Sequence, residues 1–230
     1  MKYFKWIGLI VFVAAIASCK KEKIIPTSPS FEYFPVSKGR FVVYDVDSIV
    51  HADNDGNTDD SVYSWHFQIK ERIDSTYIDG QNRPVQVLNR FRRLNDTLPW
   101  LQSNVWTQLI TSSAAYKTED NIIYHKLSFP INLQISWNGN DMNTLGDEEY
   151  AYEAVHNSRA FGSLSFDSTI TVFQGDPENY DNIVERKFGR EVFANHIGLI
   201  YKERDDLRKV NHIIVKGTEY KMTVINYGTE

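Results

Sequence analysis

The stretch Ser61–Gly80, "SVYSWHFQIKERIDSTYIDG", decides the fold class of this chain. Through its first half large apolar side chains alternate with polar ones, and the apolar positions are Tyr63, Trp65, Phe67 and Ile69. A period of two is typical of a strand with one buried face, whereas a helix would scatter these aromatics around its axis. The stretch therefore predicts a long strand that ends in a turn at "IDGQNRP".

Comparable runs fill most of the remaining chain. They cover residues 41–50, 85–94, 105–111, 122–129, 131–137, 164–173, 183–188, 199–203 and 220–227. Turn signals such as "NDG", "NGND", "QGDPEN" and "VKGTEY" stand between them. Many closely spaced strands predict a mainly β fold with little helix, an antiparallel curled sheet, a sandwich or a partly open barrel.

Helix is predicted at three places only. These are "PWLQSNVW" (99–106), "LGDEEYAYEAV" (145–155) and "GREVFANHIG" (189–198). The second has acidic residues in its first turn, as a helix N-terminus favours. We expect one β-rich domain from residue 34 to 230, and the alternative is two small β domains that meet near 138–146.

Residues 1–18 have the order of a secretory signal peptide: two lysines, an apolar run from Trp6 to Ile16, then Ala17 and Ser18. The apolar run is shorter than the roughly 20 residues that span a bilayer. Residues 16–19, "IASC", resemble the bacterial lipobox, in which the cysteine receives a diacylglyceryl group, usually a further acyl chain, and becomes the first mature residue. Cys19 is the only cysteine in the chain, and more than one acyl chain anchors a protein stably.

The segment after Cys19 is predicted to be a tether. Residues 19–33, "CKKEKIIPTSPSFEY", combine Pro and Ser with charged residues, a composition that favours an extended and weakly structured chain. Surface-exposed lipoproteins of Bacteroidetes resemble one another in having acids soon after the cysteine, whereas three lysines and one glutamate follow here. We therefore expect an anchor in the outer membrane and a domain that faces the periplasm.

The charge balance argues against nucleic acid as a partner. The full chain has a formal net charge of −5, and removal of residues 1–18 takes away two lysines and no acid, which leaves −7. A protein of this charge needs a concentrated basic stripe to hold phosphates. Arg90, Arg92 and Arg93 are the nearest approach, but strand alternation divides them between two faces.

One acidic segment has the donors of a calcium loop. In "HADNDGNTDDS" (51–61), oxygen-bearing side chains alternate around Gly56, at Asp53, Asp55, Asn57 and Asp59. The spacing does not fit the EF-hand, because alignment on Gly56 places His51 and Val62 at the first and last ligand positions. The same segment is also a plausible polar hairpin connection between two strands.

Two side chains are singled out for acid–base chemistry. His125 alternates in phase with Ile123 and Leu127 and so should point inward, as a core residue or a catalyst. Glu71 continues the inward phase of the 61–80 strand, but we expect a strand end or bulge to return it to solvent. If it stayed inside, paired carboxylates for glycan hydrolysis would be the enzymatic alternative.

Other chemistry lacks sequence support. No zinc-type histidine spacing, catalytic thiol, G-x-S-x-G elbow or phosphate-binding glycine loop is present, so we expect no catalytic residue, metal or cofactor. Aromatic residues are abundant, with five Trp, thirteen Tyr and thirteen Phe. They either fill a core or line a groove.

Two stretches resemble small envelope lipoproteins of Bacteroidetes. "YFPVSKGRFVVYDVDSI" (33–49) is similar to their "FP-x-x-x-G-x-x-W-x-Y" opening, with Phe41 or Val42 where an aromatic is usual. "FANHIGLIYKERDDL" (193–207) is similar to their "G-x-G-L-[IV]-Y-K-E" segment, with His196 in place of the first glycine. The resemblance implies an antiparallel β domain without assigned activity or functional residues.

Anchor and strands together suggest a non-enzymatic lipoprotein of the outer membrane. Its β domain would bind an apolar or amphipathic ligand in an aromatic cleft, or an envelope protein. The second hypothesis is a structural or assembly component of an envelope complex that uses strand edges or an aromatic patch. The third is the glycan hydrolase.

Overall fold

The computed structural model describes residues 30–52 and 61–230. The lipobox cysteine Cys19 and the calcium candidates Asp53, Asp55, Asn57 and Asp59 lie outside the described residues. Their assignments stay predictions.

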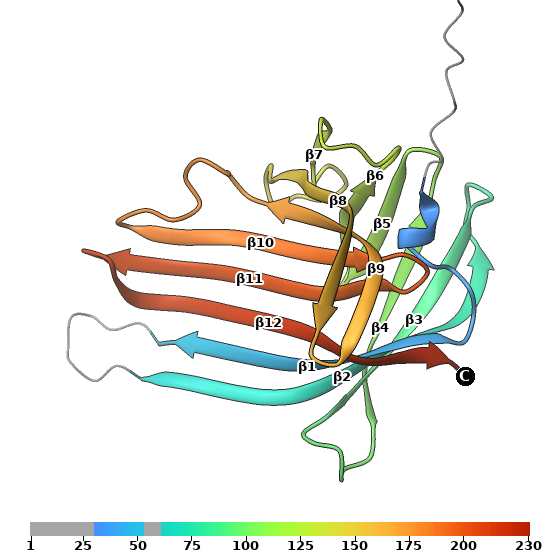
Figure 1. The fold of residues 1–230 in the computed structure, drawn as a ribbon, viewed down its shortest axis with the longest axis horizontal. Helices are drawn as coiled ribbons and strands as arrows, with labels where there is room; N and C mark the ends of the chain where they lie inside the picture. The colour runs from blue at the N-terminus through green and yellow to red at the C-terminus, as the bar shows by residue number, and fades with distance from the viewer. Residues whose placement is uncertain (1–29, 53–60) are drawn as a thin grey trace, which may run out of the picture.

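Almost all of the described chain belongs to one antiparallel sheet of twelve strands (Figure 1). The strands are β1 (Arg40–His51), β2 (Val62–Ile78), β3 (Pro84–Arg93), β4 (Leu101–Ile110), β5 (Ala114–Glu119), β6 (Ile122–Ser128), β7 (Ser136–Asn138), β8 (Glu149–Phe161), β9 (Leu164–Gln174), β10 (Glu185–Ala194), β11 (Gly198–Val210) and β12 (Ile213–Thr229). Their order is β6-β5-β4-β3-β2-β1-β12-β11-β10-β9-β8-β7, so strands that are neighbours in sequence pair with one another, except β6 and β7, and β1 also pairs with β12. The sheet curls until it nearly closes into a barrel, which confirms the predicted fold class.

The three predicted helices are wrong. Residues 99–106 lie largely in β4, 145–155 enter β8, and 189–198 lie mostly in β10. In the second stretch Tyr150 and Tyr152 are buried while Glu149 and Glu153 are exposed, which is strand alternation. Its acids belong to a strand and not to a helix first turn.

Strand predictions differ from the structure mainly in the middle of the chain. Residues 131–137 were predicted as a strand, but only 136–138 form β7. The short β5, "AAYKTE", was not predicted, because two alanines and alternating charges do not have the pattern of a half-buried strand.

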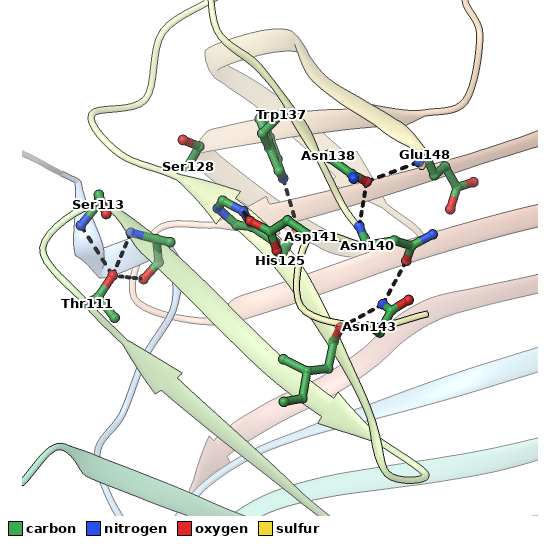
Figure 2. Close-up of polar contacts among 12 residues, drawn as sticks. Thr111, Ser113, His125, Ser128, Trp137, Asn138, Asn140, Asp141, Asn143 and Glu148 are labelled. Carbon is green, nitrogen blue, oxygen red and sulfur yellow. Dashed lines mark hydrogen bonds and ion pairs between the residues drawn. The ribbon is translucent and has the colours of Figure 1, made fainter. Parts of the chain in front are cut away.

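The two edges of the curled sheet, β6 and β7, meet at a seam (Figure 2). The amide of His125 donates to the carbonyl of Gly139 at 2.9 Å, and the indole N–H of Trp137 donates to the carbonyl of His125 at 2.8 Å. The Tyr152 hydroxyl donates to the carbonyl of Ser128 at 2.6 Å and lies 3.1 Å from the Ser128 amide nitrogen. Side chains thus supply much of the bonding that a regular strand pair would provide.

The buried apolar side chains form two large clusters and a small third one of Ile73, Leu88 and Trp106. One centres on β1, β2 and β12, with Tyr44, Val46 and Met222 almost inaccessible to solvent. The other joins β6, β8, β9 and β10 to the N-terminal segment.

That N-terminal segment corrects the predicted extent of the tether. Phe31–Tyr33 forms a 3-10 turn, η1, that packs into the second cluster. Tyr33 and Phe34 are 1% and 5% exposed. The Tyr33 hydroxyl shares hydrogen bonds with Ser168 Oγ at 2.6 Å and His156 Nδ1 at 2.8 Å. The fold therefore already includes residues 31–33, which the sequence assigned to the tether.

Candidate functional site

The inside of the curled sheet contains charged side chains from both halves of the chain. Lys126 on β6 pairs with Glu191 on β10 at 2.8 Å, and Lys202 on β11 lies 3.5 Å from Glu119 on β5. In the sheet order β6 is not adjacent to β10, and β5 is not adjacent to β11. The ion pairs must therefore cross the interior. We call Glu71, Arg90, Lys117, Glu119, Lys126, Glu191 and Lys202 the interior ion cluster.

Glu71 belongs to this cluster, so the expectation that it returns to solvent was wrong. It is 7% exposed in the middle of β2, since β2 continues to Ile78 and its bulge comes only after Ile73. Lys117 Nζ lies 2.7 Å from one carboxylate oxygen and Arg90 Nε lies 2.9 Å from the other. Burial alone would raise the pKa of Glu71, but the two cations outweigh it and hold the pKa below its usual value.

The remaining members form a four-sided arrangement of two acids and two lysines. Lys126 Nζ lies 3.2 Å from Glu119 and 2.8 Å from Glu191, and Lys202 Nζ lies 3.5 Å and 3.4 Å from the same two carboxylates. Burial opposes ionisation, yet the lysines keep the pKa of both acids below normal, and the acids keep the pKa of Lys126 well above normal. Glu119, Glu191 and Lys126 are therefore charged at neutral pH.

This arrangement bears on the hydrolase hypothesis. Glu119 and Glu191 each have an oxygen within 3.2 Å of Lys126 Nζ, so these oxygens are at most about 6 Å apart, a spacing found in glycosidases. Such enzymes also need one protonated carboxyl group as the acid. The lowered pKa values of Glu71, Glu119 and Glu191 leave none of them in that state.

His125 is buried at the seam, 7% exposed, between Tyr116 and Trp137 (Figure 2). Its Nδ1 lies 2.9 Å from Asp141, while its Nε2 has no hydrogen-bond partner. The following residue, Lys126, is the one whose side chain joins the interior ion cluster. In the described ranges 30–52 and 61–230 no three His, Cys, Asp or Glu side chains are grouped so that they could hold a metal.

A hollow of about 830 Å³ lies between the 139–149 segment on one side and β10 and β11 on the other. We call it the mouth pocket. Its wall has seven acids and four bases, namely Glu119, Asp147, Glu148, Glu149, Asp176, Glu185 and Asp206 with Lys126, Lys187, Lys202 and Arg204. Glu119, Lys126 and Lys202 are also members of the interior ion cluster, which therefore contributes to the floor of this pocket.

The seam positions one wall of the mouth pocket through hydrogen bonds of the 138–148 segment, which Figure 2 shows. Asn138 Oδ1 accepts hydrogen bonds from the amides of Asn140 and Glu148, which closes the loop on itself. Asn143 Nδ2 donates to the carbonyl of Ile123 at 2.8 Å and so holds the loop against β6. Loop residues Asn140, Leu145, Gly146 and Asp147 line the pocket as a result.

The aromatic residues mostly fill the core. A second hollow, of about 60 Å³, lies beneath Phe34, Tyr44 and Phe193 next to the ion cluster. Ligand pockets usually measure 300–1,000 Å³, so this space suits no more than a few water molecules. Tyr63 and Trp65 are exceptions to the packing, since they stack on one another at 6.0 Å and are 53% and 46% exposed.

No family model and no curated protein matches the chain significantly. Two solved structures are similar in fold. One is described as a candidate exported protein with a YmcC-like fold from Bacteroides fragilis, with a TM-score of 0.45, 11% identity, and coverage of 85% of this chain and 98% of that chain. The other is described as a candidate lipoprotein from Parabacteroides distasonis, with a TM-score of 0.44, 8% identity and the same coverages. In the part of the chain that the structure describes, no helix is long and apolar enough to cross a membrane.

Glu71 and Arg90 are the only members of the interior ion cluster that the sequence analysis considered; it did not identify Lys117, Glu119, Lys126, Glu191 or Lys202. Lys117 and Glu119 share a face of β5, and Glu191 lies between Arg190 and the apolar run "VFA". Opposite charges in the middle of buried strands are the signal that points to them. That signal becomes readable only when the pairing of strands is known.

Proposed function

We propose that the chain is a lipoprotein anchored at Cys19 to the outer membrane, facing the periplasm, whose β domain binds a polar ligand in the mouth pocket. The anchor rests on the signal peptide that ends at the only cysteine. The binding function rests on one observation, a hollow of about 830 Å³ with a charged wall. The apolar ligand of our first hypothesis has less support, because the interior between the apolar clusters is occupied by ion pairs.

The anchor is tested by Cys19→Ala in the full chain. Cells given a radiolabelled fatty acid should label the wild type and leave the variant unlabelled, and the variant should leave the membrane fraction. Protease treatment of intact cells tests the orientation. Digestion of the domain would contradict a periplasmic position.

The pocket is tested by thermal unfolding of the purified domain with 10 mM of single compounds. A neutral sugar, a sugar amine or an amino acid should raise the melting temperature, because a ligand that binds only the native state stabilises it. Palmitate at its solubility limit should give no increase. Stabilisation by palmitate alone would overturn the polar-ligand proposal in favour of the apolar one.

A protein partner is the second candidate, and a specific edge supports it. β3 pairs with β2 only from Gln68 onward, so residues 62–67 of β2 have β1 on one side and, among residues 30–52 and 61–230, no strand on the other. This free edge contains neither lysine nor proline, the residues that usually protect an edge, and it presents the Tyr63–Trp65 stack. Co-purification of wild type and Ser64→Pro after detergent extraction tests whether a partner is lost with the edge.

A further inference from the structure

The wall of the mouth pocket has an excess of negative charge that the protein does not neutralise. Three of its four bases are already in ion pairs: Lys126 and Lys202 with the interior acids, and Arg204 with Glu148 at 2.5 Å. Five of its acids have no ion-pair partner among the described residues: Asp147, Glu149, Asp176, Glu185 and Asp206. Lys187, which faces Asp206 across β10 and β11, is the remaining cation.

A second feature of the pocket calls for a hydrogen-bond acceptor. Gln174 lines the pocket at the end of β9 and is 3% exposed, and its amide nitrogen has no hydrogen-bond partner. Tyr150, its cross-strand neighbour on β8, lines the same wall and is 2% exposed. A buried donor without a partner destabilises the fold, and a ligand oxygen placed there would relieve this cost.

Acids at the rim and a buried donor deeper in the pocket define two ends of a ligand. We infer that the mouth pocket takes a small molecule with a protonated amine next to hydroxyl or carbonyl oxygens, as in a sugar amine or the amino end of a peptide. This inference rests on the proposed function, since it specifies the ligand of the same pocket. The amine lies toward Glu185 and Asp206 on β10 and β11, and an uncharged oxygen accepts from Gln174.

The charges of the pocket wall favour an amine-bearing ligand over anionic and neutral ligands. A pocket wall of one dominant sign concentrates ligands of the opposite sign, and this attraction weakens with salt. A carboxylate or phosphate ligand would meet five acids without ion-pair partners, whereas three of the four cations in the wall are already in ion pairs and only Lys187 is not. A neutral sugar would satisfy Gln174 and leave the acids unused.

Calorimetric titration of the folded domain with four probes tests the inference. Glucosamine carries both features, glucose only hydroxyls, putrescine only amines, and glucuronate a carboxylate. We expect glucosamine to bind at least 10-fold tighter than each of the others. Glycyl-lysine amide serves as the peptide probe, and comparison with glucosamine distinguishes the two sources of the same chemistry.

Matched variants locate the binding. Glu185→Gln with Asp206→Asn should weaken glucosamine binding at least 10-fold and leave the weak binding of glucose unchanged, while Gln174→Met should weaken glucosamine and glucose alike. Asp47→Asn, an exposed acid outside the pocket on β1, is the control and should change nothing. Circular dichroism on each variant confirms that it is folded.

The outcomes separate the two proposals. Equal binding of glucose and glucosamine, unaffected by the acid variants, overturns this inference and leaves the polar-ligand function in place. Tightest binding of glucuronate or of putrescine also overturns it, because one of the two ends is then wrong. Binding of palmitate without any polar probe overturns both.

Discussion

At the scale of single residues, the charges inside the sheet are the main departure from an ordinary β core. A buried ion pair often contributes little compared with well-packed apolar residues, but loss of one partner leaves an uncompensated charge. Lys126 is the extreme case, since it is 4% exposed and contacts two carboxylates. Its removal leaves Glu119 and Glu191 with Lys202, which is more distant from both, as their shared cation.

Lys126→Met should therefore lower the free energy of unfolding by about 3–5 kcal/mol. Urea denaturation measures it. The matched control is Lys187→Met, the same substitution at an exposed lysine without an ion-pair partner among the described residues, which should change stability by less than about 0.5 kcal/mol. Equal effects of the two substitutions would show that the cluster is not energetically coupled.

Asp205 shows the opposite behaviour to the acids of the cluster. It is 3% exposed on β11, and Arg186 Nε lies 3.0 Å away. Burial raises the pKa of Asp205 to about 6; Arg186 opposes this, and Glu219 and Glu203 add to it. The folded protein therefore binds a proton that the unfolded chain releases near pH 4, so this residue makes the fold less stable as pH rises through about 6.

Asp205→Asn should remove this dependence. Relative to wild type, the variant should gain about 1–3 kcal/mol of unfolding free energy between pH 4 and pH 7.5, from 1.36 kcal/mol per unit of pKa shift. Denaturant curves at both pH values measure the difference. A constant offset between the two proteins across this range would contradict the raised pKa.

The sequence predicts whether a side chain is buried only where this depends on the alternation within its own strand. The alternation in 61–80 correctly places Phe67, Ile69 and Glu71 in one inward phase, and the strand end proposed to rescue Glu71 does not exist. The cations that make its burial tolerable come from β3 and β5, and their proximity depends on strand order. His125 was correctly predicted to be buried, but its contacts belong to the seam.

At the scale of elements, the seam between β6 and β7 is the least regular part of the sheet. β7 has three residues, and side chains of Trp137 and Tyr152 carry hydrogen bonds across the gap. The sequence could not predict this, because apolar and polar residues alternate in 131–137 as they do in a strand, although residues 132–134 are exposed and only 136–138 pair with β8. Helix predictions failed at β4, β8 and β10 for a related reason, since tertiary pairing overrides local preference.

Tyr152→Phe tests the seam. Loss of the hydroxyl removes both contacts to the backbone of Ser128, which should cost about 1–3 kcal/mol and speed hydrogen exchange at that amide. Tyr77→Phe is the control, because Tyr77 is 48% exposed and its hydroxyl has no hydrogen-bond partner in the described part of the chain. Unchanged exchange at β6 would mean that the seam does not depend on Tyr152.

At the scale of the whole molecule, one end of the sheet is closed by the chain's own N-terminal segment. Tyr33 and Phe34 are inserted into the core, and the Tyr33 hydroxyl joins β8 and β9. The sequence analysis placed the boundary between tether and β domain at residue 34, whereas the packed structure already includes Phe31–Tyr33. Proline and serine upstream resemble a linker, whereas "FEY" is short and has no period that would mark it as core.

A chain that begins at Ser30 should unfold like the mature protein, whereas one that begins at Pro35 should melt at least about 10 °C lower. Burial of two large aromatics is worth several kcal/mol, and each kcal/mol shifts the midpoint by about 2–4 °C in a protein of this size. Differential scanning calorimetry on both chains measures the shift. Coincident transitions would show that η1 only rests on the surface.

The interior ion cluster also constrains the order in which the protein forms. Its acids and bases come from β2, β3, β5 and β6 in the first half of the chain and from β10 and β11 in the second. If the first half collapsed alone, Lys126 would keep Glu119 but lack Glu191, and the second half alone would bury Glu191 with Lys202 but without Lys126. Each half-collapsed state therefore buries charges that lack one of their counterions, which carries a desolvation penalty. The two halves are therefore expected to become ordered in a single cooperative step, with no stable intermediate in which only one of them is folded.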